Sequence, residues 1–129
     1  MITLSFLKLL EQAGFGTIDV DLFFQKLTLD KKGIYIADVG TNNLRGTRKS
    51  QGYELYARGN SDTDGYKRLH EISKYLEENY SNICELPPVP TVTTESYRNV
   101  VVQRPSTITN VGLDAQNRII YSISGNIIY

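Results

Sequence analysis

The chain has 129 residues, which is the length of one domain of ordinary size. Apolar residues make up 40% of it and charged residues 22%, and this balance excludes a disordered tail, a collagen-like fibre and a coiled coil as the main body. Lys and Arg total 14 and so do Asp and Glu, so no overall charge draws the protein to nucleic acid or to an anionic membrane. No apolar stretch reaches the roughly 18 residues that a membrane span needs.

The first expected element is a helix over residues 2–13, followed by Gly14 at a position where helices commonly end. The apolar residues that share one arc, at about 100° per residue, are Ile2, Phe6, Leu9, Leu10 and Ala13. Leu4 and Leu7 point to another side, so the helix carries more apolar surface than one sheet face needs. The segment lacks the basic start and the cleavage site of a signal peptide, and we expect it to be part of the fold.

Two strands and a turn are expected next. Apolar and polar residues alternate over residues 18–29, with Val20, Leu22 and Phe24 on one side. Residues 34–39 form a second apolar run after a turn-like cluster at residues 30–33. The short spacing predicts that the two strands pair as an antiparallel hairpin.

Residues 40–52 are expected to form a long loop, because they contain a single large apolar side chain, Leu44. The loop carries three cations, Arg45, Arg48 and Lys49, and nothing in its composition gives it a core to join. We expect it to be poorly ordered in the free subunit. A third strand follows over residues 53–58, where apolar and polar residues alternate again.

The second half of the chain contains the clearest helix, over residues 64–80, with Ser61, Asp62 or Thr63 as its cap. Its apolar arc consists of Tyr66, Leu69, Ile72, Leu76 and Tyr80. Three prolines make residues 86–90 extended. Residues 97–103 and 118–129, rich in Val, Ile and Tyr, are expected to be strands, with a turn at residues 114–117.

This order predicts an α+β fold: one domain over residues 1–129, with two helices packed on a mostly antiparallel sheet of about five strands.

Few side chains are available for catalysis, since His70 is the sole histidine and Cys84 the sole cysteine. His70 lies at the boundary of a helix face, and Cys84 is expected to be a small buried apolar residue. A single cysteine forms no internal disulfide, which favours a reducing, intracellular setting. We expect no cofactor and no resident metal.

Asp19 and Asp21 provide the one metal-site hypothesis. On a strand they would share a face, as a magnesium-dependent nuclease requires, although alternation predicts the same pair for any half-exposed strand. The cluster Arg45, Arg48 and Lys49 offers a second alternative, a small DNA-binding accessory domain that contacts phosphates. The competing interpretation of that cluster is a solvated loop. Nine tyrosines and no tryptophan give a weak indication of protein contacts.

Read as a whole, the layout resembles the small tail terminator and head-tail joining proteins of long-tailed bacteriophages, including those called minor capsid proteins. The segments that carry the resemblance are residues 4–10 with Gly14-Phe15-Gly16, residues 33–38 with Gly40, the helix at 64–80, and the ending from Val101 to Ile127 with its proline, its Asp114 turn, Arg118 and Tyr121. Ser124-Gly125 departs from the family pattern, and the glycine suggests a bulge or a close backbone approach.

The resemblance implies a structural, non-enzymatic protein of the phage neck, assembled in the host cytoplasm. It implies a hexameric ring that caps the tail tube, contacts the tube protein below and a neck, stopper or connector protein above, and encloses DNA without sequence preference. Within that picture we expect Leu4 and Leu7 to lie at the subunit interface. We expect Arg45, Arg48 and Lys49 to meet a partner or the DNA in the lumen.

Overall fold

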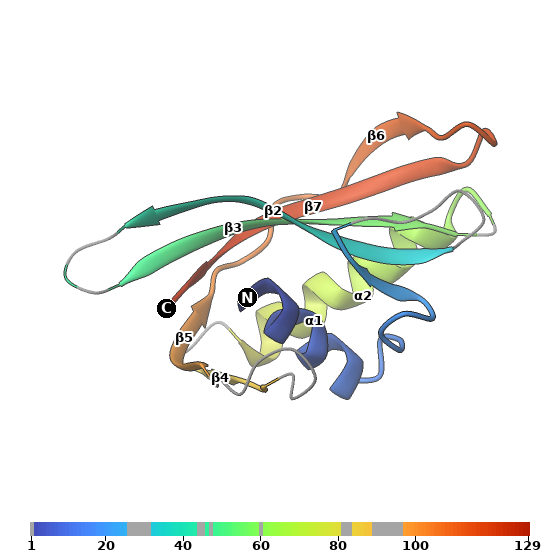
Figure 1. Ribbon diagram of the computed structural model, residues 1–129. Helices are drawn as coiled ribbons and strands as arrows, with labels where there is room; N and C mark the ends of the chain where they lie inside the picture. Colours follow the sequence, from blue (N-terminus) through green and yellow to red (C-terminus); the bar gives the residue numbers. More distant parts are fainter. Residues whose placement is uncertain are drawn as a thin grey trace.

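In the computed structural model, the described residues are 2–25, 32–43, 46, 48–59, 61–80, 84–88 and 97–129, and they form an α+β fold. Within them, two helices lie on one face of a seven-stranded sheet whose order is β1-β2-β3-β7-β5-β4, with β6 also paired to β7 (Figure 1). The helices are α1 (Ile2–Gln12) and α2 (Asp64–Asn79). The strands are β1 (Leu22–Phe24), β2 (Gly33–Asn43), β3 (Lys49–Arg58), β4 (Cys84–Leu86), β5 (Tyr97–Val102), β6 (Thr109–Leu113) and β7 (Ile119–Ile128).

The sheet is larger than expected and mixed, so the prediction of about five mostly antiparallel strands is corrected. In its described part β1 is parallel to β2, with Leu22 opposite Ile34, whereas the other strand pairs are antiparallel. The predicted antiparallel hairpin is therefore wrong. The strand expected from residue 18 is also shortened, because a turn precedes β1. The carbonyl of Thr17 accepts hydrogen bonds from the amides of residues 20–22, and the carboxylate of Asp21 accepts one from the Thr17 amide. The turn delays the strand until residue 22.

The expected loop at residues 40–52 is replaced by strands over most of its length. β2 and β3 continue toward the hairpin tip, with Thr41 opposite Gln51 and Asn43 opposite Lys49. A register shift between Asp38 and Gly40, where Gly40 has a φ of 139°, accommodates an extra residue. Pairing here depends on main-chain hydrogen bonds and on polar contacts such as Thr41 Oγ1 to Gln51 Oε1 at 2.6 Å. Apolar periodicity could not reveal it.

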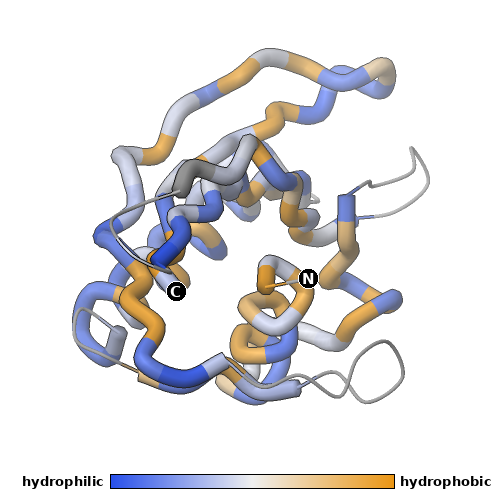
Figure 2. Tube along the Cα trace, turned by 60° about the vertical axis from the view of Figure 1, so that its left-hand side comes forward, coloured by the Kyte–Doolittle hydropathy of each residue, from blue (hydrophilic) through white to orange (hydrophobic). Residues whose placement is uncertain are grey.

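Helix α1 forms as expected, and Gly14 follows it with a φ of 90°. The expectation that Leu4 and Leu7 provide spare surface for a subunit interface is wrong, because they are only 6% and 0% exposed. Helix α1 contacts β1, β2, β3 and β4, and in Figure 1 it lies between the sheet and β4. In Figure 2 the hydrophobic part of α1, beside the N-terminus, is enclosed by the surrounding chain.

Helix α2 covers the rest of the same sheet face. Leu69, Ile72 and Leu76 are buried, as the apolar arc predicts, whereas Tyr66 is 48% exposed at the first turn. Thr63 occupies the cap position, but its side chain makes no capping hydrogen bond. The side of α2 that faces away from the sheet is polar and exposed to solvent.

Strand β7 runs through the middle of the sheet, with β3 on one side, and the predicted strands at 97–103 and 118–129 are confirmed. The β3–β7 register is unbroken at Gly125, opposite Tyr53, so the glycine does not mark a bulge. A Cβ at Gly125 would lie 2.7 Å from the hydroxyl oxygen of Tyr53, whose ring packs against Phe6. The close backbone approach expected at this glycine is confirmed.

Candidate functional site

The basic end of the β2–β3 hairpin is held against the rest of the sheet. The amide of Lys49 donates to the carbonyl of Tyr129 at 2.7 Å, and the amide of Tyr129 donates back at 2.9 Å. Arg48 donates from Nη1 to the carbonyl of Asn99 at 2.9 Å, which joins the hairpin to β5. For these two residues the expected free loop is wrong, because Lys49 pairs through its main chain and Arg48 bonds to β5 through its side chain. Arg45 lies outside the described residues.

The side chain of Lys49 is exposed, whereas Arg48 is half-buried beside β5. The structure therefore brings two of the three expected cations to one end of the sheet, and of these two Lys49 is the more exposed. The rings of Tyr97 and Tyr129 meet edge to face at 5.7 Å and add apolar surface to this end.

Asp19 and Asp21 do not share a strand face, because both precede β1. Asp19 has a φ of 69°, and the Asp21 carboxylate accepts the Thr17 amide at 2.6 Å and lies 3.6 Å from the Arg68 guanidinium. These contacts give Asp21 a structural role in the turn. In the part of the chain that the structure describes, no group of three His, Cys, Asp or Glu side chains is placed to hold a metal ion.

His70 and Cys84 lie on different elements. His70 is exposed on α2 and stacks on Tyr66, with ring centroids 6.3 Å apart. Cys84 is half-buried on β4 and packs against the core, and burial raises the pKa of its thiol. The expectation of a small buried apolar residue is met in part, since Cys84 packs against the core but is half-buried.

A charged cluster that sequence reasoning had not assigned lies where the turn between β6 and β7 meets the end of β3. Asp114 accepts the Arg118 amide and Nε, both at 2.9 Å, and lies 3.3 Å from Nη1 of Arg58. The side chains of Arg58 and Asp114 are 5% and 4% exposed. Burial opposes the charged carboxylate, but the hydrogen bonds from the Arg118 and Gln116 amides and from the Arg118 guanidinium hold the pKa of Asp114 below its ordinary value. The signal in the sequence was the Asp-turn-Arg spacing.

The sheet face opposite the helices carries an aromatic pair. Tyr35 and Tyr56 stack with centroids 4.8 Å apart and planes 13° apart, and the Tyr56 hydroxyl donates to the Glu54 carboxylate. That hydrogen bond, with burial, raises the pKa of Tyr56 to about 12. In the described structure most tyrosines contact another tyrosine, so their number reflects internal packing as well as surface.

The sequence matches no family model, and no curated protein matches it. Among the described residues no helix has both the length and the apolar character needed to cross a bilayer.

Proposed function

We propose that this chain is a structural, non-enzymatic protein of a phage neck. It forms a hexameric ring that caps the tail tube, ends its polymerisation and meets a neck, stopper or connector protein. The resemblance of the sequence suggests this role. The observation in the fold that supports it best is the β2–β3 hairpin, which extends past both helices (Figure 1).

The hairpin has a rigid base. β3 has 10 residues, about 33 Å at ~3.3 Å per residue, and it is paired with β7 from Ser50 to Ala57, so only its first residues belong to the part that extends past the helices. Its basic end is anchored by the paired backbones of Lys49 and Tyr129 and by the bond from Arg48 to Asn99. An arm fixed in this way pays little ordering entropy when a neighbouring subunit binds it.

A ring suits the task of ending a polymer. Head-to-tail contacts between identical subunits close when the rotation per subunit divides the circle, and a closed ring offers no free subunit contact for further growth. Six weak contacts to a tube act together through their effective concentration. The exposed Lys49 side chain places one cation per subunit where an acidic tube surface or lumen DNA attracts it, and salt weakens this attraction.

Mass measurement and imaging of the purified chain test the proposal. We expect particles of six chains, each of 14.6 kDa, that appear as rings in electron micrographs. Lys49→Ser should leave the mass of the six-chain particle unchanged and weaken its attachment to tail tubes at low salt. Lys67→Ser, on the outward side of α2, is the matched control and should change neither. A chain that stays monomeric at every concentration, alone and with tubes, contradicts the proposal.

A further inference from the structure

The side of β7 opposite β3 is lined by one long, irregular stretch of chain. Val101 in β5 lies opposite Ile128, and Thr109 in β6 lies opposite Ser122. Between them, the Gln103 amide donates to the Asn126 carbonyl at 3.0 Å and the Ser106 amide to the Ser124 carbonyl at 2.7 Å. Residues 103–108 therefore continue the sheet between β5 and β6, and no described strand pairs with their outer side.

This stretch, which we call the 103–108 edge, has unused backbone donors. Within the described residues, the amides of Arg104 and Thr107 make no hydrogen bond, whereas those of Gln103 and Ser106 bond to β7. Alternate residues of an antiparallel strand direct their backbone groups to opposite sides. Pro105 has no amide, and Gln103 and Ser106, which both bond to β7, are three residues apart, so the alternation is interrupted there. The edge therefore offers two separate outward amides, those of Arg104 and Thr107, at which another strand can add.

Two hollows flank the 103–108 edge, each of about 430 Å³. One is a groove between the edge and the outward side of α2, with Tyr66, Lys74 and Ile108 in its wall. The other lies on the sheet face away from the helices, beside Glu54, with Gly52 and Gly125 lining it. Arg104 and Ser106 border both hollows. Because successive side chains of a strand point to opposite faces, an added strand would place them alternately in the two hollows.

The charges of the groove select for acidic side chains. Arg104 lies 3.4 Å from Glu77, and both side chains are largely exposed. Lys74 has no ion pair within the described structure, and His70 stacks on Tyr66 nearby. The groove therefore has an excess of positive charge, whereas the other hollow contains one carboxylate, Glu54, and one guanidinium, Arg104.

We propose that the 103–108 edge binds an extended peptide segment of a partner protein as an added β-strand, with acidic side chains facing α2 and uncharged side chains facing the opposite hollow. Main-chain hydrogen bonds to Arg104 and Thr107 supply affinity, and the two hollows supply specificity. Lys74 is the residue that selects for acidic side chains, and Tyr66 and Ile108 offer apolar contact at the other end of the groove. This inference is independent of the ring proposal.

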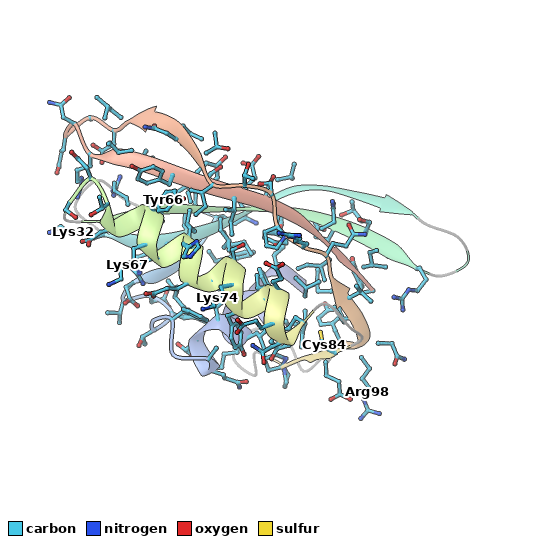
Figure 3. All side chains as sticks on the ribbon, turned by 180° about the vertical axis from the view of Figure 1, so that it is seen from behind. Lys32, Tyr66, Lys67, Lys74, Cys84 and Arg98 are labelled. Atoms are coloured by element: carbon cyan, nitrogen blue, oxygen red, sulfur yellow. The ribbon has the colours of Figure 1, made fainter. Side chains whose placement is uncertain are left out.

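Selection from a pool of random nonapeptides tests the proposal on three proteins: the wild type, Lys74→Glu and Lys67→Glu. Lys67 is an exposed lysine of the same helix that does not line the groove, so it is the matched control (Figure 3). We expect Asp and Glu to be enriched at alternate positions with the wild type and with Lys67→Glu. The preference should be lost with Lys74→Glu, which should bind an enriched acidic peptide about 10-fold more weakly, because an exposed ion pair is replaced by a repulsion.

Main-chain pairing is tested with one enriched peptide whose alternate amides are N-methylated. Methylation should abolish binding measured by fluorescence anisotropy, and the unmodified peptide should shift the amide resonances of Arg104 and of residues 106–108. Equal binding of the methylated peptide overturns strand addition. The proposal also fails if no acidic preference appears, if Lys67→Glu acts like Lys74→Glu, or if the pool yields no binder while the edge pairs with a second copy of the chain.

Discussion

Removing the hydroxyl of Tyr53 should stabilise the protein. Tyr53 is fully buried, and within the described residues its hydroxyl makes no hydrogen bond. Burying an unpaired hydroxyl costs about 1–3 kcal/mol, whereas the space left by a single oxygen atom costs well under about 1 kcal/mol. Tyr53→Phe should therefore raise the free energy of unfolding by about 1 kcal/mol, and the melting temperature by roughly 4 °C for a chain of this size.

Urea denaturation followed by circular dichroism measures this change, and Tyr121→Phe is the control. The Tyr121 hydroxyl donates to the Asp62 carbonyl at 2.8 Å, so its loss should lower the free energy of unfolding by about 1 kcal/mol. The two variants remove the same atom and should move stability in opposite directions. If Tyr53→Phe destabilises the protein as much as Tyr121→Phe does, the hydroxyl has a partner and the reasoning is refuted.

Three further changes probe the fold. Gly125→Ala should lower the free energy of unfolding by about 1–3 kcal/mol, because its Cβ would lie 2.7 Å from the Tyr53 hydroxyl; an unchanged urea midpoint would contradict this close contact. Leu7→Ala should lower the free energy of unfolding by about 2–5 kcal/mol in a monomer as well as in any assembly. A loss confined to the assembled form would show instead that Leu7 lies at a subunit interface. Asp114 has a lowered pKa, so its stabilisation is present above the ordinary carboxyl pKa of about 3.9 and is lost as the pH falls through the folded-state value. The gap in urea midpoint between the wild type and Asp114→Asn should close on acidification, and a constant gap from pH 7 to pH 2 would show that the charge is unimportant.

Local patterns predicted the elements that bury one regular face. The arcs of α1 and α2 and the branched and aromatic residues of β5 and β7 were sufficient to place them. β6 was missed because all five of its residues are exposed, so no alternation marks it. The distal part of the β2–β3 hairpin was missed for a related reason, since it is built of polar residues and glycines and shows no apolar alternation.

Contacts between segments that are distant in the sequence account for the other predictions from the sequence that were wrong or missing. The helix pattern alone predicted that Leu4 and Leu7 would be left uncovered, but both are buried in the fold, where α1 contacts β4, a strand some 80 residues later, as well as β1, β2 and β3. The groove beside the 103–108 edge also depends on distant residues, because α2 and the edge are far apart in the sequence and come together only in the fold, where Arg104 lies 3.4 Å from Glu77. The sequence offered the Asp114 turn and Arg118 as motifs, whereas the third member, Arg58, becomes a neighbour only in the folded sheet.

Electron microscopy of tail tubes polymerised with and without this chain tests the central claim most directly. On the proposed role, the tail-tube protein that this chain caps should, when assembled in its presence, give tubes with a ring of six subunits at one end only. Those tubes should stop growing when more tube protein is added. Tubes that bear no ring and lengthen equally with or without the chain would contradict the account.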